Sequence, residues 1–114
     1  MIVEKVLVES VQLTTSVAVY YTTSVKVHAV IGQATLCNTT GGAQTVKIYL
    51  TPPGASPGPE NAIIWQQSIP AGQTAILAPM VNHGLVPAGS SIQALASAGA
   101  SLTFRVSGYE RAVS

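Results

Sequence analysis

The side chains able to transfer protons, bind metal ions or act as nucleophiles are few in this sequence and stand far apart. The chain contains no Asp, and its four carboxylates are Glu4, Glu9, Glu60 and Glu110. Catalysis by a carboxylate pair needs two such groups facing one cleft. Nothing in the sequence places any two of them together, so this mechanism is not expected.

The two histidines and the single cysteine offer neither a metal motif nor a nucleophile with a base. His28 and His83 are far apart, whereas a zinc site takes three or four ligands, typically at short spacings. A Cys37 nucleophile needs a basic partner, and His28 falls in the same predicted strand. We therefore expect no enzyme, cofactor or metal ion. Only a pocket that joined His83, Glu60 and Cys37 would reopen that question.

Ionised side chains are unusually scarce. Asp, Glu, Lys and Arg make up 8% of the 114 residues, against about 25% in ordinary soluble domains. The net charge is +1 and the five cations are scattered, so nucleic-acid binding is not expected. So neutral a surface indicates that much of it is covered in an assembly, most simply by copies of the chain itself. The alternative is a small monomer rich in Thr and Ser.

The sequence predicts no membrane segment and no signal peptide. No uncharged apolar run approaches the ~20 residues that a bilayer-spanning helix needs. Glu4, Lys5 and Glu9 interrupt the apolar pattern of residues 1–13, which is atypical of a signal-peptide core. We expect a protein made in the cytoplasm and not exported by a cleaved signal.

The elements that would position these side chains are predicted to be strands throughout. In residues 44–51, Val46, Ile48 and Leu50 alternate with Lys47 and Tyr49, as expected of a sheet with one buried face. Residues 1–13 are rich in β-branched side chains and are read as an edge strand or an extended arm. The other predicted strands are residues 17–22, 24–37, 62–69, 73–77, 92–97 and 102–109.

Turn signals separate these strands. Gly41-Gly42 indicates a hairpin turn after Asn38. Pro70-Ala71-Gly72 is predicted to join residues 62–69 and 73–77 as a strand pair, and Ala98-Gly99-Ala100 to join 92–97 and 102–109 likewise. Pro-Ala-Gly recurs at Pro87-Ala88-Gly89, and the tripeptide suits a type I turn with proline second and glycine fourth.

Seven or eight short strands without helices predict an all-β fold, a single antiparallel β-sandwich or jelly roll that spans residues 1–114 as one domain. Such strands leave sheet edges, and an edge with few charges pairs readily unless a neighbouring subunit covers it. The pattern again favours an oligomer.

Two groups of residues are candidate contact sites. The loop at residues 52–59 contains four prolines, so it is exposed, and it serves either as a connection or as a contact element. The aromatic residues form either a platform for sugar rings or core and subunit contacts, of which we favour the contacts. The candidate interface residues are Tyr20, Tyr21, Tyr49, Pro53, Pro57, Pro59 and Trp65.

Several segments resemble small virion proteins of tailed bacteriophages. They are the Tyr20-Tyr21-Thr22 run and residues 38–50, 61–64, 68–74, 85–94 and 102–110. The resemblance implies a jelly-roll or sandwich protein, often a homotrimer, that sits on the capsid surface as a decoration (cement) protein and binds the major capsid protein or other virion proteins. A tail, neck or fibre module that binds glycans is the alternative. The resemblance brings no catalytic residue, and residues 1–13 match least.

Overall fold

In the computed structural model, which describes residues 2–85 and 88–112, the chain is built almost wholly of strands. The elements are β1 (Ile2–Gln12), β2 (Ala18–Thr22), β3 (Val27–Asn38), β4 (Gln44–Thr51), the 3-10 turn η1 (Pro59–Asn61), β5 (Ala62–Ile69), β6 (Thr74–Ile76), the 3-10 turn η2 (Ala78–Met80), β7 (Gly84–Leu85), β8 (Ser91–Ala96) and β9 (Leu102–Ala112).

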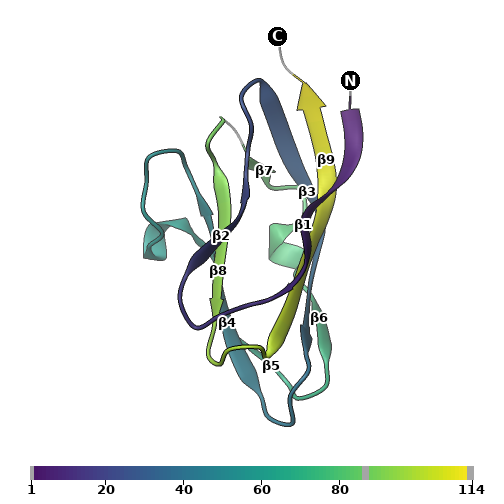
Figure 1. The fold of residues 1–114 in the computed structure, drawn as a ribbon, viewed down its shortest axis with the longest axis vertical. Coiled ribbons are helices and arrows are strands. Elements are labelled where there is room, and N and C mark those ends of the chain that lie inside the picture. The colour runs from purple at the N-terminus through teal and green to yellow at the C-terminus, as the bar shows by residue number, and fades with distance from the viewer. Residues whose placement is uncertain (1, 86–87, 113–114) are drawn as a thin grey trace.

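The strands form two antiparallel sheets that face each other (Figure 1). Sheet A has the order β1-β9-β3-β6, with the two-residue β7 also paired to β3, and sheet B has the order β2-β8-β4-β5. Leaving β7 aside, the first strand pairs with the last, the second with the second last, and so on inward. This nested pairing is that of a jelly roll. The predicted all-β antiparallel sandwich is confirmed.

The predicted strand pairs across the short turns are wrong. β5 lies in sheet B and β6 in sheet A, and β8 and β9 are divided between the sheets in the same way. The turn between β3 and β4 also crosses from one sheet to the other (Figure 1). Turn residues fix where the chain reverses, but not whether the next strand pairs with the last or crosses to the opposite sheet.

The assignment of the Pro-Ala-Gly turn is also corrected. The Gln73 amide donates to the Pro70 carbonyl at 3.1 Å, so proline is the first residue of the turn and glycine the third. Gly72 has φ of +69°, which a type II turn requires at this position. In the second copy Pro87 lies outside the described residues, and Gly89 has φ of +92°.

The core lies between the two sheets and is apolar. Strand alternation sends side chains of both sheets into it, because neighbouring residues of a strand point to opposite faces. Its fully buried large side chains are Leu13, Ile31, Leu36, Val46, Ile48, Ile69, Leu77, Met80, Leu85, Ile92, Leu102 and Phe104.

A buried asparagine ties the two sheets together at one end. Asn38 is the last residue of β3, in sheet A. Its side-chain Nδ2 donates to the carbonyl of Ile69, the last residue of β5 in sheet B, at 2.9 Å. The same Nδ2 donates to the Gly42 carbonyl, also at 2.9 Å. Its Oδ1 accepts from the backbone amide and hydroxyl of Thr40 at 2.9 and 2.7 Å. One side chain thus holds the turn and both sheets.

The middle of sheet A contains a close backbone approach. β3 has an irregularity between Ile31 and Gln33 where it pairs with β9. There, a Cβ on Gly108 of β9 would overlap the Val30 carbonyl oxygen and come within 3.0 Å of the Gly32 nitrogen. Only glycine fits at position 108 without a shift of the backbone.

Candidate assembly surfaces

Leaving the two-residue β7 aside, every strand at the end of a sheet exposes a large apolar side chain. These are Ile2 on β1 and Ile76 on β6 in sheet A, which are 66% and 64% exposed, and Val19 on β2 and Trp65 on β5 in sheet B, which are 55% and 49% exposed. β1 also carries three charged residues, whereas β2 and β5 carry none. Charges on an edge strand discourage pairing with another chain, so both edges of sheet B lack that protection.

A second exposed area lies on the outer face of sheet A, across β1, β9 and β3. We call it the Tyr109 surface, and it consists of Ile2, Glu4, His28, Val30, Tyr109 and Arg111. The strand register explains why they share a face: Tyr109 lies opposite Glu4 and Val30, and Arg111 lies opposite Ile2 and His28.

Two grooves flank the 44%-exposed Tyr109 side chain. The first, of about 490 Å³, is mainly apolar and is bounded by Ile2, Val30 and Arg111 among others. The second, of about 510 Å³, is lined by Glu4 and other residues on the opposite side of the ring. The ring lies close to Gly32, whose added Cβ would stand 3.7 Å from Tyr109 Cε2. A Cβ at this position would make an ordinary van der Waals contact with the ring, so the tyrosine packs directly over the backbone of β3 at Gly32.

The Tyr109 surface carries a cation and a carboxylate that are not paired with each other. Among the described residues the ion pairs are Lys5 with Glu110 and Arg105 with Glu9, and neither Glu4 nor Arg111 takes part in one. Arg111 Nη2 lies 3.4 Å from His28 Nδ1. Both charges are therefore available to an opposite charge on another molecule.

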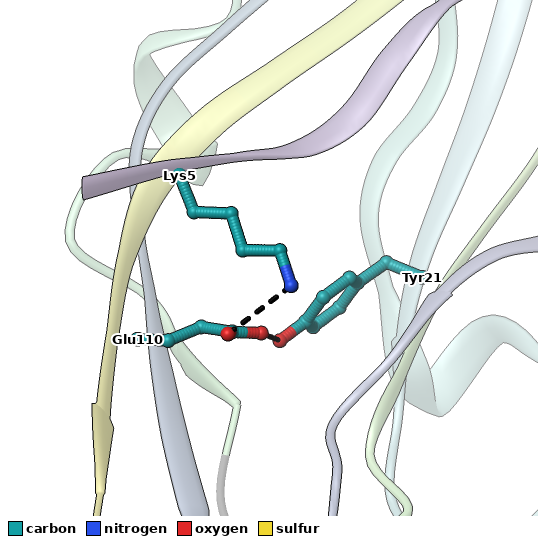
Figure 2. Close-up of polar contacts among 3 residues, drawn as sticks. All are labelled: Lys5, Tyr21 and Glu110. Carbon is teal, nitrogen blue, oxygen red and sulfur yellow. Dashed lines mark hydrogen bonds and ion pairs between the residues drawn. The ribbon is translucent and has the colours of Figure 1, made fainter. Parts of the chain in front are cut away.

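A polar cluster of Lys5, Tyr21 and Glu110 joins the two sheets next to the Tyr109 surface (Figure 2). Glu110 of β9 accepts a hydrogen bond from the Tyr21 hydroxyl of β2 at 2.5 Å, and Lys5 Nζ of β1 donates to its other oxygen at 3.2 Å. An irregularity in the β2–β8 pairing at Tyr20 aims both consecutive tyrosines toward sheet A. Tyr20 packs its ring edge-to-face on Phe104, with centroids 6.2 Å apart.

The cluster shifts the pKa values of two of its members. Burial, followed by the hydrogen bond and the negative charge of Glu110, raises the pKa of Tyr21 far above its ordinary value. The Tyr21 hydrogen bond, helped by Lys5 and opposed by partial burial, lowers the pKa of Glu110 below 4.5. The stabilisation from ionised Glu110 is therefore complete above pH 4.5 and is lost as the pH falls through the lowered pKa. Neutral Tyr21 contributes fully below pH 10.

Replacing Tyr21 with Phe is expected to lower the free energy of unfolding by about 1–2 kcal/mol at pH 7, because it removes a hydrogen bond to a charged group. The difference from wild type should begin to shrink below pH 4.5 and vanish as the pH falls through the lowered pKa of Glu110, where the folded protein binds the proton. Urea unfolding followed by fluorescence between pH 3 and pH 7 measures it. Tyr20→Phe is the matched control and should change stability little, since it keeps the ring contact with Phe104. Equal effects of the two substitutions at every pH would contradict the role of Glu110.

The aromatic candidates do not form one platform. Tyr20 and Tyr21 point between the sheets, whereas Tyr49 and Trp65 meet edge-to-face on β4 and β5, with centroids 6.5 Å apart. Tyr49 is almost fully buried, so only Trp65 is well exposed. Lys47 Nζ lies 4.4 Å from the centre of the Trp65 ring, a cation–π contact that holds the indole against the sheet.

The proline loop is partly anchored to the fold. Pro53 is exposed, and its Cβ lies so near Gly89 that a Cβ added there would come within 2.9 Å. Pro57 is half-buried, and Pro59 is exposed and begins η1. The loop therefore offers a fixed surface beside sheet B.

The structure does not bring the possible catalytic residues His83, Glu60 and Cys37 together in either groove beside Tyr109. His83 and Glu60 are exposed and Cys37 is half-buried in β3, and none of them lines either groove beside Tyr109. Within residues 2–85 and 88–112, no three His, Cys, Asp or Glu side chains are grouped to hold a metal ion. The same residues contain no helix long and apolar enough to cross a membrane.

Sequence reasoning missed the Tyr109 surface. Residues 102–109 were predicted as a strand that ends at Tyr109, with no contact role for that residue, and the charged residues Glu4 and Arg111 lie near opposite ends of the chain. Only the pairing of β1 with β9 brings Glu4 close to Tyr109 and Arg111, and no local sequence pattern predicts that pairing.

Comparison with known proteins identifies the fold. The sequence matches no protein-family model and none of the curated proteins. One similar solved structure is that of Bacillus endospore appendages, described as a novel family of disulfide-linked pili: the TM-score is 0.59 and the identity 16%, over 99% of this chain and 89% of that one. Another, from infectious bursal disease virus strain Gx, has a TM-score of 0.49 and 12% identity, over 96% of this chain and 32% of that one. The first shares this chain's all-β fold along nearly its whole length.

Proposed function

We propose that this chain is a structural subunit that works by assembling with copies of itself and with other proteins. The observation that carries the proposal is the exposed apolar side chain on each end strand of both sheets. An exposed sheet edge is a template for another chain, and apolar side chains beside it gain free energy when a neighbour covers them. The edge strands of sheet B, β2 and β5, carry no charged residue that would oppose the pairing of another strand.

The scarcity of ionised residues supports the same role. Small soluble domains usually rely on interspersed charges to prevent association, and here these residues make up 8% of the chain. A jelly roll that assembles is also seen in the appendage subunit, a likeness of fold only. Ser107 lines one groove together with Glu4 and Lys5, but among the described residues no hydrogen bond joins Ser107 to either, and Lys5 is paired with Glu110. The grooves therefore give no indication of an activated nucleophile.

Within this role we propose a virion protein, a capsid decoration subunit that binds between capsomers. The segments that resemble small phage virion proteins support this location, as does a neutral surface suited to lying against a protein lattice. The proline loop, fixed beside sheet B, and Trp65 are then contact elements. A homotrimer that binds the major capsid protein is the form that the resemblance implies.

A tail, neck or fibre module is the second candidate, favoured by one observation. Trp65 is half exposed on the outer face of sheet B and is oriented by Lys47 and Tyr49. A fixed indole face beside polar groups suits the stacking of a sugar ring. In that case Trp65→Ala should abolish glycan binding without unfolding the chain.

Mixing the purified chain with empty expanded phage heads separates the two candidates. A decoration protein is expected to sediment with the heads at a saturating, fixed ratio to the capsid protein. Absence of co-sedimentation, together with glycan-array binding that Trp65→Ala removes, would favour the tail or fibre module. Failure in both assays would contradict the virion assignment.

A further inference from the structure

We propose that the Tyr109 surface is a two-fold contact between two copies of this chain. The inference rests on the proposed self-assembly and adds to it the surface, the symmetry and the residues that pair. The argument is charge complementarity: the surface carries one carboxylate and one guanidinium, and neither is in an ion pair among the described residues.

The register places these groups so that the surface complements itself. On β9, Tyr109 and Arg111 point outward two residues apart, and on β1 Glu4 lies opposite Tyr109 and Ile2 opposite Arg111. A two-fold axis in the plane between two facing sheets, crossing β9 midway between Tyr109 and Arg111, exchanges the two positions. Each Arg111 then stands over the partner's Tyr109 and beside the partner's Glu4.

This two-fold contact gives Arg111 and Glu4 the oppositely charged partners that they do not have within one chain. Facing sheets pack about 10 Å apart, a gap that Arg, Glu and Tyr side chains span from both sides. Arg111 gains a carboxylate and an aromatic face. Glu4 lies above the partner's Ile2, next to the partner's Arg111. Because the contact is isologous, each favourable pair occurs twice.

The shape of the surface also fits a second copy. The grooves on the two sides of Tyr109 measure about 490 and 510 Å³. In the two-fold arrangement the groove bounded by Ile2 and Arg111 lies opposite the partner's Tyr109, and the groove lined by Glu4 lies next to the partner's Arg111. Ile2, Val30 and Tyr109 then supply apolar contact area, and Arg111 lies beside Tyr109 near the axis, where it stacks on the partner's ring.

Charge-reversal variants test the contact. Misfolded variants would not regain association when they are mixed, so recovery on mixing identifies the contact itself. In Glu4→Arg, two cations face each other at both ends of the contact, and in Arg111→Glu two carboxylates do so. We expect each variant alone to weaken self-association about tenfold or more, as measured by sedimentation velocity of the protein without added tags. An equimolar mixture of the two variants places opposite charges together again, so it should regain most of the wild-type association.

Glu9→Arg and Arg105→Glu are the matched controls. They make the same charge changes on the same two strands, but six residues along β9, a distance of roughly 20 Å. Both should associate like wild type within about twofold.

The outcomes separate this contact from the proposed function. Wild-type association with Glu4→Arg and Arg111→Glu indistinguishable from the controls would overturn the contact and leave self-assembly in place. Weakened single variants that do not recover on mixing would also overturn it. A wild type that does not associate would overturn both.

Discussion

Gly108→Ala is expected to lower the free energy of unfolding by at least about 3 kcal/mol. The added Cβ would overlap the Val30 carbonyl oxygen and lie 3.0 Å from the Gly32 nitrogen, and both are backbone atoms that cannot rotate away. β9 pairs with β1 on one side and β3 on the other, so a displacement there disturbs the centre of sheet A. Thermal unfolding followed by circular dichroism should show a midpoint lowered by roughly 10–20 °C.

Two other glycines are matched controls for that substitution. A Cβ on Gly32 would meet its nearest atoms at 3.4 Å, and one on Gly41 would meet nothing within 4 Å. Gly32→Ala should therefore cost about 1 kcal/mol or less, and Gly41→Ala should be near neutral. If all three substitutions had equal effects, backbone entropy and not the close approach of β3 and β9 would explain them.

Asn38→Ala is expected to lower the free energy of unfolding by about 2–4 kcal/mol, because it leaves buried polar groups of both sheets without partners. The lost hydrogen bonds include those to the carbonyls of Gly42 and Ile69 and those from Thr40. The turn between β3 and β4 should loosen as well. Amide hydrogen exchange of Thr40 and Gly42 reports that loosening, and urea titration gives the free energy.

Asn61→Ala removes the same kind of side chain from a single exposed hydrogen bond, which Nδ2 makes with the Ser56 carbonyl at 3.1 Å. It should change the free energy of unfolding by no more than about 0.5 kcal/mol. An equally small effect of Asn38→Ala would show that water replaces the network without cost, contrary to the burial of that side chain.

The sequence predicted the fold class because strand alternation and turn residues are local signals. In residues 44–51 the side chains of Val46 and Ile48 are buried as predicted and Leu50 is half-buried, but Tyr49, predicted on the opposite face, is buried as well. The pairing of strands is not local. Pro70-Ala71-Gly72 marks a reversal correctly, yet β5 and β6 lie in different sheets, because β5 pairs with β4, the strand before it, whereas β6 pairs with β3.

The candidate sites were less predictable, since they depend on irregular pairing and distant contacts. The irregularity at Tyr20 turns two consecutive tyrosines the same way, against the usual alternation. Tyr21 then reaches Glu110, 89 residues later in the sequence. Trp65 was named from its residue type alone, and its contact with Lys47 follows from the β4–β5 pairing.

The most direct test of the account is whether the chain associates with itself. Static light scattering of the untagged wild-type protein, across a wide concentration range, measures the molar mass that answers this question. We predict that the mass rises with concentration above the 11.7 kDa of a single chain, to at least that of two chains. A mass that stays at one chain up to about 1 mM, where even contacts of about −4 kcal/mol become populated, would contradict the account.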